Sequence, residues 1–397
     1  MMSAGVFKTA TRGSGARATE TGSARSGSAG SDSAGTASAG TASARTDLQA
    51  PAPAATSRTL RAGTWLSLPV RSRSLTVAVS LVAAVLVVAV LTVTLGTLGI
   101  APADVVASVL GQGIGTDRIV WGTIRGPRLV VAVAAGAALG IAGTLFQTVT
   151  RNPLGSPDVI GLSAGAAAGA AAFGVLWTGI VPQSVGALIG ACAAMTLVFL
   201  ATGRGFASPS RMLLAGIGVS AMSLAFVEYV IVRVGREEAI TLAAYLSGTL
   251  ASRSWEHAAT IWVSLVVLMP FALAISRRLQ LVEMGDEQAD ALGAASGRTR
   301  LFAVLVSIGL ATAAVNVVGP IGFIALAAPQ IARRLVRAPG PNVVTSALTG
   351  ALLLCLADLL TQQSPLPVQL PVGVLTALIG GVYLGYLLLG QWKKGSL

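Results

Sequence analysis

The chain has 397 residues, of which 54% are hydrophobic and only 11% are charged, and its formal net charge is +12. This composition excludes an ordinary water-soluble domain and indicates a protein that uses lipid as its solvent. A basic chain can bind nucleic acid, but no aromatic interleaving and no recognition motif accompany the charge here. We therefore expect membrane lipid, and no nucleic acid, among its partners.

Residues 1–72 differ from the rest of the chain, because they are almost entirely Ser, Ala, Gly, Thr and Arg. A segment with so few large apolar side chains cannot bury enough surface to offset the entropy of ordering. We therefore expect a disordered tail over 1–72 and one membrane domain over 73–397. The tail lacks the apolar core and cleavage site of a signal peptide. Its excess of Arg over acidic residues indicates a cytoplasmic N-terminus.

The rest of the chain contains about ten apolar segments, each near the roughly 20 residues that a helix needs to cross a bilayer. These segments lie at about 74–98, 129–147, within 151–173, 184–202, 211–232, 257–275, 300–317, 321–335, 342–361 and 371–390. The segment within 151–173 is dense in Gly and Ala, so we expect it to be buried in the bundle. The sequence thus predicts an all-α polytopic protein of the plasma membrane, with both termini in the cytoplasm.

The stretch LVEMGDEQADALG at 281–293 concentrates charge between two long apolar blocks, on the predicted cytoplasmic side. Its four acidic residues are Glu283, Asp286, Glu287 and Asp290. Their spacing of i, i+3, i+4 and i+7 places them on one face of a continuous helix. Repulsion among them would destabilise a lone helix, and Gly285 interrupts it. We predict two short helical pieces held by a partner, and a solvated loop is the alternative that the pattern leaves open.

Few residues of the membrane domain suggest a chemical site. Cys192 and Cys355 both lie inside apolar runs, so we expect two buried thiols and no disulfide. The single histidine, His257, cannot form a metal site alone, and its place beside two tryptophans indicates an interfacial side chain. No nucleophile and base pair and no metal-ligand cluster is recognisable. We expect neither an enzyme nor a metal site.

A transport protein needs a source of work, and the chain has no P-loop, because none of its three lysines lies in the required motif. Ion-coupled carriers usually keep acidic residues at membrane depth. Only Glu228 and Asp358 are candidates for such a position, and Asp358 could instead be a structural hydrogen-bond acceptor. The energy is therefore expected from a partner, and an ion-coupled secondary transporter is the alternative of another class.

Six blocks of sequence, in order, resemble the membrane permeases of iron-siderophore and vitamin B12 ABC importers, from about residue 74 to the end. They are RGPR at 125–128, the run LGIAGTLFQTVTRNPLGSPDVIGLSAGAAAG through 169, LLAGIGVS at 213–220, the acidic stretch, GPIGFIALAAPQIARRLV at 319–336, and ADLL with LPVGVLTALIGG at 357–381. The resemblance implies a ten-helix permease without a cofactor of its own. It also implies a cytoplasmic ATPase dimer that binds ATP, an extracytoplasmic binding protein, and a second permease, identical or paralogous.

The same resemblance assigns roles to particular residues. The positions that match the family's ATPase-coupling loop are Glu283, Gly285, Asp286, Glu287, Ala289, Leu292 and Gly293. Arg125 and Arg128 match a pair that can meet acidic residues of the binding protein, and an interfacial anchor is the alternative for this pair. Ser208 and Ser210 align with a loop that closes the cytoplasmic end of the pathway. Another two positions, Asn152 and Pro153, are expected to shape a turn.

Two positions depart from the family pattern. Gln330 stands where the family usually has His after a Pro, which removes a titratable group, and Gln362 stands where an Arg is frequent. The second departure weakens a docking set of three arginines. The expected cargo is an iron(III)-siderophore chelate, with cobalamin or haem as the alternative cargo.

Overall fold

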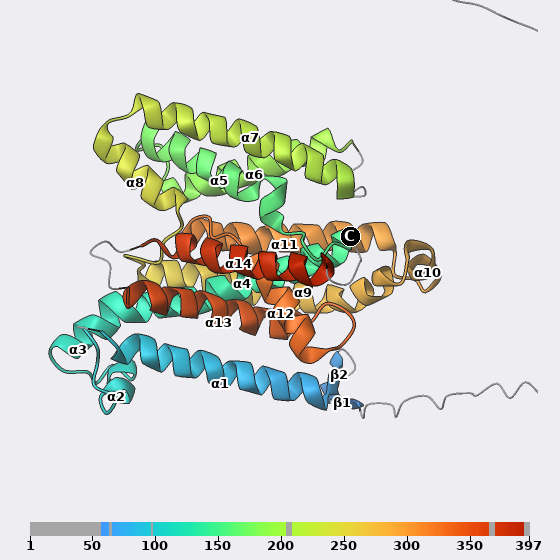
Figure 1. Cartoon of the computed structure of the whole chain (residues 1–397), viewed down its shortest axis with the longest axis horizontal. Helices are drawn as coiled ribbons and strands as arrows, with labels where there is room; N and C mark the ends of the chain where they lie inside the picture. Colours follow the sequence, from blue (N-terminus) through green and yellow to red (C-terminus); the bar gives the residue numbers. More distant parts are fainter. Residues whose placement is uncertain (1–56, 63–65, 97, 204–208, 365–369, 393–397) are drawn as a thin grey trace, which may run out of the picture. The chain divides into compact units, whose positions relative to one another are not determined.

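Figure 1 shows the computed structural model, which describes residues 57–62, 66–96, 98–203, 209–364 and 370–392. All of them belong to one compact unit, Ala55–Leu397. The α-helices are α1 (Ser72–Thr94), α2 (Val105–Val109), α3 (Thr116–Ile119), α4 (Gly126–Thr150), α5 (Leu162–Ala171), α6 (Gln183–Ala201), α7 (Pro209–Arg233), α8 (Arg236–Leu246), α9 (Trp255–Glu283), α10 (Asp286–Ala291), α11 (Ser296–Val318), α12 (Ile324–Val336), α13 (Val343–Gln362) and α14 (Val372–Trp392). Short π-helical and 3-10 segments are η1 (Val120–Arg125), η2 (Pro157–Ile160) and η3 (Ala172–Leu176).

Seven helical segments of the described chain are long and apolar enough to cross a membrane. They are Ser72–Thr94, Thr116–Thr150, Gln183–Ala201, Ser210–Arg233, Trp255–Glu283, Ser296–Val318 and Val343–Gln362. Leu162–Leu176 and Val372–Gly385 are apolar but shorter, and α12 has 13 residues. Each of the ten predicted segments contains a helix, so the multi-pass helical class is confirmed. Ten crossings and cytoplasmic termini stay predictions.

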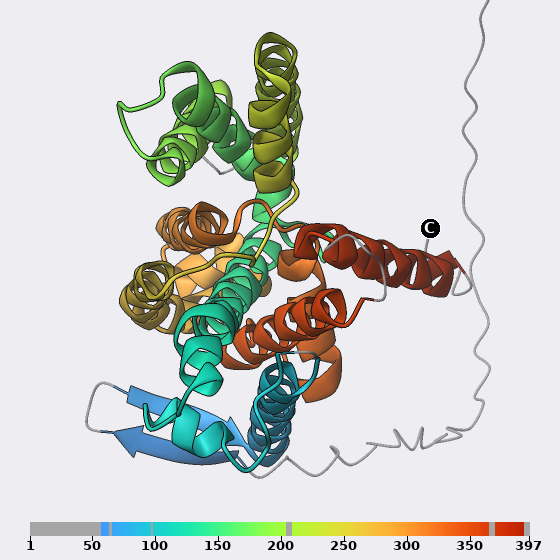
Figure 2. The same ribbon diagram turned by 90° about the vertical axis from the view of Figure 1, so that its left-hand side faces the viewer.

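Helix α4 is the centre of the bundle. In the apolar stretch that ends with this helix, 89% of the residues are buried by neighbouring helices. It packs against α13, α11, α9 and α12, which surround the teal helix in Figure 2. Glycines allow the closest of these contacts. A Cβ atom on Gly140 would lie 2.1 Å from the Ser346 carbonyl oxygen, and one on Gly350 would lie 2.1 Å from that of Gly136. Small residues therefore let the backbones of α4 and α13 touch.

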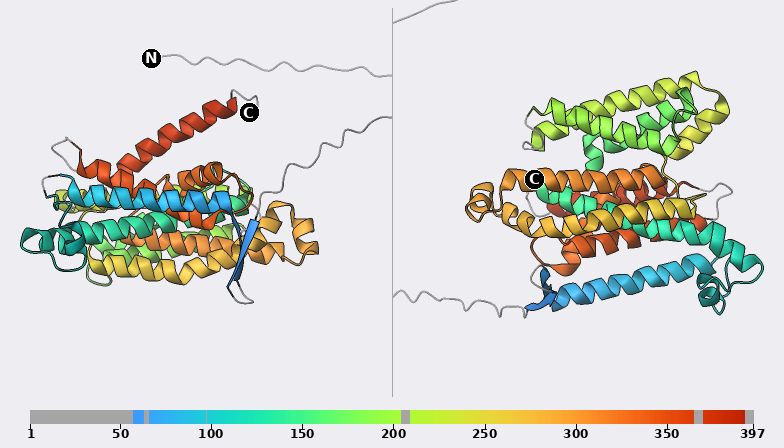
Figure 3. Two further views of the ribbon diagram at one scale, coloured as in Figure 1. Left: turned by 90° about the horizontal axis from the view of Figure 1, so that it is seen from below. Right: turned by 180° about the vertical axis from the view of Figure 1, so that it is seen from behind.

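Helices α5 to α8 form a second group, which lies on α11, on the side away from α1 (Figures 1 and 3). Within it, α5 and α6 approach closely through glycines on both helices. A Cβ atom on Gly169 would lie 2.1 Å from the Gly186 carbonyl oxygen, and one on Gly190 would lie 2.2 Å from that of Gly165. The expectation of a buried Gly- and Ala-rich third helix is confirmed for α5.

The described chain begins with an antiparallel hairpin of β1 (Ser57–Ala62) and β2 (Leu66–Arg71), in which Ser57 pairs with Arg71. The expectation of a disordered segment over 1–72 therefore does not hold for these two strands. The residues of β2, LSLPVR, alternate in polarity with the period of a strand, and a composition averaged over the whole tail hides this alternation. Residues 1–56 lie outside the described residues.

The two cysteines differ in environment. Cys355 on α13 is buried, as expected, whereas Cys192 on α6 is exposed, so the prediction of a second buried thiol is wrong. Both thiols are free. Cys192 lies on an apolar helix, but the outer surface of such a helix is as apolar as its packed side, so an apolar run does not indicate which side a residue faces.

Candidate functional site: the coupling segment and the paired arginines

The acidic stretch 281–293, here called the coupling segment, lies at one end of the bundle, and α2 and α3 lie at the other (Figure 1). Helix α9 ends at Glu283, and α10 begins at Asp286. Gly285 between them has a φ of +128°, a conformation that side-chain-bearing residues rarely adopt. The two predicted helical pieces with a break at Gly285 are therefore present. Because of the break, Glu283 belongs to α9 and the other three acidic residues belong to α10, so the shared face that a continuous helix would give does not form.

One side of the coupling segment is packed. Ala289 is fully buried and forms a small apolar cluster with Val282 and Ala294. Its side chain holds α10 against the end of α9 and does not reach the surface. The other side is open, with Met284 and Leu292 exposed by 62% and 63%. Large apolar side chains at an exposed helix turn are typical of a contact surface for another protein.

Asp286 lies between two arginines. Its Oδ1 accepts hydrogen bonds from Arg151 Nη2 at 2.8 Å and from Arg300 Nη2 at 2.6 Å. Arg151 follows directly after α4 and has a φ of +50°, and Arg300 lies in the first turns of α11. The same Nη2 of Arg151 also donates to the Val282 carbonyl oxygen at 2.6 Å. This carboxylate thus connects α10 to the ends of α4, α9 and α11.

The other acidic residues of the coupling segment differ in their surroundings. Asp290 accepts from the Ser296 backbone N–H at 2.6 Å and from its hydroxyl at 3.0 Å, so it caps the start of α11. Glu283 lies near the guanidinium of Arg333 and within hydrogen-bond reach of the Gly340 backbone. Glu287 is exposed, and no ion pair joins it to the described part of the chain.

The segment after α4 forms a turn in which Asn152 Oδ1 accepts from the Leu154 backbone N–H at 2.9 Å. This local hydrogen bond is typical of Asn at turns. The carbonyl oxygen of Pro153 accepts from Gln330 Nε2 of α12 at 2.9 Å. Asn152 and Pro153 therefore lie at a structural turn that contacts α12. Nearby, burial raises the pKa of the Asp158 carboxyl, and the Ser163 hydroxyl opposes this shift.

Gln147 is a buried polar residue that the sequence reasoning missed. Its Nε2 donates to the Leu326 carbonyl oxygen at 3.0 Å. Its Oε1 accepts from Gln330 Nε2 at 2.8 Å and from Arg333 Nη2 at 2.5 Å. The signal was an amide inside an apolar segment, since buried polar groups at membrane depth need partners. Gln330, noted only as a departure from the family pattern, connects this network to the turn at Pro153.

Arg125, expected as part of an exposed pair, is instead buried, with 7% of its surface exposed. Its Nη1 donates to the carbonyl oxygens of Thr92, Val93 and Leu95 at 2.5, 3.0 and 2.6 Å. The last carbonyls of a helix have no partner within it, and they attract a cation. Arg125 therefore stabilises the C-terminal end of α1.

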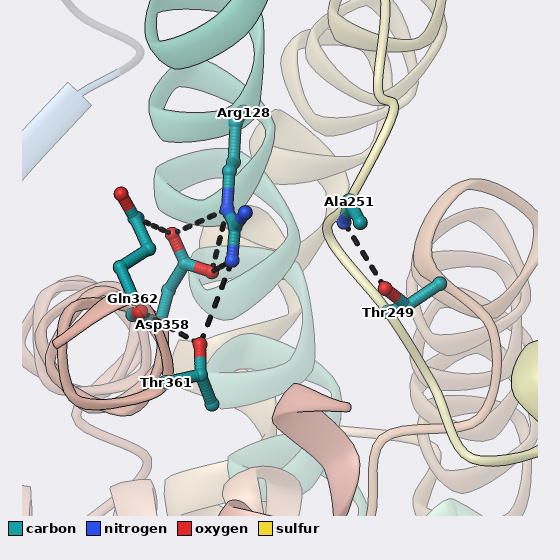
Figure 4. A network of polar contacts seen from close by, with 6 residues as sticks. All are labelled: Arg128, Thr249, Ala251, Asp358, Thr361 and Gln362. Atoms are coloured by element: carbon teal, nitrogen blue, oxygen red, sulfur yellow. Dashed lines mark hydrogen bonds and ion pairs between the residues drawn. The ribbon is translucent and has the colours of Figure 1, made fainter. Parts of the chain in front are cut away.

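Arg128 forms a two-point ion pair with Asp358 of α13, as Figure 4 shows. Its Nε and Nη2 lie 2.9 and 2.7 Å from Asp358 Oδ1, and Gln362 Nε2 donates to Asp358 Oδ2 at 2.8 Å. Asp358 is thus a structural acceptor in this arrangement. Binding-protein docking by Arg125 and Arg128 stays a prediction, and it would require both guanidinium groups to leave these partners.

Two cavities open beside Arg128. One of about 150 Å³ is lined also by Thr249, Gln362 and Pro371. A larger one of about 680 Å³ is lined by residues of the 251–255 loop, including Arg253. Arg253 donates to the Val317 carbonyl oxygen at 2.8 Å, and burial lowers the pKa of its guanidinium. This end of the bundle is therefore hollowed, and arginines line both cavities.

Three predicted residues contribute little to these sites. Ser208 lies outside the described residues. Ser210 is exposed in the first turn of α7, and Glu228 is exposed on the same helix. Among the described residues, no group of three or more His, Cys, Asp and Glu side chains could hold a metal ion.

The chain is similar to known transport proteins. A model of the FecCD transport family matches residues 83–390. The ferric enterobactin transport system permease protein FepG of Escherichia coli (strain K12) is 37% identical over 321 residues, which cover 81% of this chain and 96% of that protein. The Fe(3+)-citrate import system permease protein YfmE of Bacillus subtilis (strain 168) is 37% identical, covering 76% and 90%.

The hemin transport system permease protein HmuU of Yersinia pestis is 34% identical, covering 70% of this chain and 85% of that protein. Among solved structures, a metal-chelate type ABC transporter in an inward-facing conformation is 25% identical, with a TM-score of 0.69. That likeness covers 79% of this chain and 99% of the other. Sequence and fold therefore indicate the same group of proteins.

Proposed function

Because the chain belongs to the FecCD transport family, we propose that it is the permease subunit of an ABC importer for iron(III)-siderophore chelates. The observation that carries the proposal is the family match over residues 83–390, since it includes both the membrane helices and the coupling segment. The cargo class rests on relatives named for ferric enterobactin and for Fe(3+)-citrate. The seven apolar helices together with this family support a position in the plasma membrane.

The mechanism is alternating access driven from outside the chain. A separate pair of ATPase subunits binds ATP, closes and moves the coupling segment, and the helices reorient around a pathway at the interface with a second permease subunit. An extracytoplasmic binding protein delivers the chelate to the end of the bundle where Arg125 and Arg128 lie. We assign the cytoplasmic gate to the sequence positions Ser208 and Ser210, of which the structure describes only Ser210. A pathway of small, weakly polar residues suits a bulky chelate, because it offers no strong ligand for the metal.

The alternative cargo is haem or cobalamin, and a relative named for hemin favours haem over cobalamin. The alternative of another class, a carrier coupled to an ion through Asp358 or Glu228, has less support. Asp358 is already engaged by Arg128 and Gln362, so an ion would have to displace a guanidinium. Uptake that collapses with an uncoupler while ATP is held constant would favour this carrier.

The first experiment is a pull-down of the tagged chain from mild detergent, followed by identification of co-purifying proteins. The test variant neutralises the coupling segment with Glu283→Gln, Asp286→Asn, Glu287→Gln and Asp290→Asn. The control neutralises three acidic residues at the other end of the bundle with Asp104→Asn, Asp117→Asn and Glu256→Gln. Recovery of a P-loop ATPase with the wild type and the control, and its loss with the test variant, would support the proposal. If folded wild-type protein recovers no ATPase, the importer assignment is wrong.

A further inference from the structure

Two acidic residues of the coupling segment, Asp286 and Glu287, differ in their surroundings, because Asp286 is paired with two arginines and Glu287 is exposed. We propose that Asp286 is a positioning residue that transmits movement of α10 to α4, whereas Glu287, with Met284 and Leu292, contacts the ATPase. This inference rests on the proposed function, because it assumes an ATPase at this surface. It separates two roles that the sequence pattern gives to all four acids alike.

The positioning role of Asp286 follows from the number of helices whose residues meet at one of its oxygen atoms. Oδ1 of Asp286 accepts from Arg151 at 2.8 Å and from Arg300 at 2.6 Å. Only 14% of the Arg300 side chain is exposed, so its guanidinium is fixed by its surroundings. Both contacts are charge-assisted hydrogen bonds, so two guanidinium groups offset the charge of this carboxylate, of which 44% of the side chain is exposed.

Arg151 connects Asp286 to the ends of α9 and α4. Its Nη2 also donates to the Val282 carbonyl oxygen at 2.6 Å, in the last turn of α9, where the helix dipole attracts a cation. Arg151 itself is the residue at which α4 ends. The end of α9 and the start of α10 are therefore both attached to the most buried helix of the bundle through one side chain.

The link continues beyond Arg151. The next residues, Asn152 and Pro153, form the turn that leads to η2 and α5, and Pro153 accepts a hydrogen bond from Gln330 of α12. A displacement of α10 that keeps the Asp286–Arg151 contact must therefore move this turn. The turn leads into η2 and α5 and contacts α12, so the movement reaches both of these parts of the chain.

The proposed contact between Glu287 and the ATPase follows from the exposure of this side chain. Glu287 is exposed and forms no ion pair within the described ranges. Met284 and Leu292, three residues before and five residues after it in the sequence, each have more than half of their surface exposed. Exposed apolar side chains and an unpaired carboxylate within one short segment suit a partner surface that combines apolar and basic side chains.

The experiment compares Asp286→Asn with Glu287→Gln, two isosteric losses of one charge on the same short helix. Each full-length variant is tested for ATPase recovery in the pull-down, and then for ferric chelate uptake per ATP hydrolysed in proteoliposomes containing the complex. Asp286→Asn should recover the ATPase normally but lower uptake per ATP by about tenfold, a factor typical of lost allosteric coupling. Glu287→Gln should lower ATPase recovery.

A cross-linking experiment distinguishes loss of transmitted movement from loss of folded structure. Arg151→Cys and Asp286→Cys are combined in a chain carrying Cys192→Ser and Cys355→Ala. The reduced protein should be uncoupled, and joining the two thiols with a short bismaleimide should restore uptake per ATP. Failure of the cross-link to restore coupling would overturn the inference even if Asp286→Asn were unstable.

The failures are distinguishable. Loss of the ATPase with Asp286→Asn would show a docking carboxylate, which overturns the inference and leaves the importer assignment standing. Normal uptake per ATP with Asp286→Asn would overturn it too. Absence of an ATPase from the wild-type pull-down would refute the proposed function itself, and the inference with it.

Discussion

Removing the ion pair between Arg128 and Asp358 gives the sharpest test of how the bundle is held together. The two groups come from the start of α4 and from α13, 230 residues apart in the chain. Only 1% of the Asp358 side chain and 18% of the Arg128 side chain are exposed. Either Arg128→Met or Asp358→Asn leaves the other charge without its partner.

The expected cost follows from this burial. Breaking a buried ion pair by removing one partner destabilises a protein by about 3–5 kcal/mol, because the remaining charge stays desolvated. Arg128 retains some exposure, so we expect about 3 kcal/mol for each single variant. The double variant Arg128→Met/Asp358→Asn carries no uncompensated charge. Its destabilisation should therefore be smaller than the sum of the two, with an interaction energy of about 2 kcal/mol.

The assay is unfolding of the purified protein by increasing SDS in mixed micelles, followed by the fluorescence of its six tryptophans. Ferric chelate uptake is measured on the same four proteins. Additive free energies would refute the claim that the pair is structural. Loss of uptake in Asp358→Asn without destabilisation, and without recovery in the double variant, would instead favour Asp358 as an ion-coupling residue.

Three further outcomes follow from the structure. Gly140→Leu should prevent assembly of α4 on α13, because even a Cβ atom would lie 2.1 Å from the Ser346 carbonyl oxygen. The readout is loss of monodisperse protein. The control Gly122→Leu should stay monodisperse, because the space around Gly122 is open. Gly285→Val should cost about 1–3 kcal/mol in local strain and lower uptake per ATP hydrolysed, and normal coupling would contradict this. Burial raises the pKa of Tyr245 to about 12, against the opposing charge of a nearby arginine. The folded state favours the neutral phenol. The contribution of Tyr245 to folding stability is therefore fully present below the ordinary pKa of about 10 and is lost as pH rises toward 12. Tyr245→Phe should therefore reduce alkaline destabilisation, measured by unfolding from about pH 9 upward, and an unchanged pH profile would contradict the buried phenol.

Local features of the sequence predicted much of the helical architecture. The ten apolar segments each contain a helix, because a run of apolar residues in lipid must satisfy its backbone internally. The break in the coupling segment was also predictable, since Gly285 interrupts the pattern within a few residues. The β1–β2 hairpin was missed, because its alternation occupies only a few residues inside a polar, Gly-rich tail.

The sequence did not predict which residues the charged side chains contact. The spacing of Glu283, Asp286, Glu287 and Asp290 would give a shared face only on a continuous helix. It did not indicate that Asp286 would meet arginines 135 and 14 residues away. Arg125 likewise looked like an exposed member of a pair, yet it caps a helix about 30 residues earlier. Such pairings depend on which helix ends meet at the same end of the bundle.

By itself, the sequence determined that this is a multi-pass helical membrane protein, that its acidic segment breaks at Gly285, and that its ordered motifs resemble metal-chelate permeases. The tertiary structure alone decided that α4 is the central helix, that Cys192 faces outward, and that Asp286 joins the coupling segment to the end of α4. The physical reason is the solvent. In lipid the outside of a helix is as apolar as its packed side, so hydrophobic periodicity, which orients helices in soluble proteins, carries little information about which residues meet.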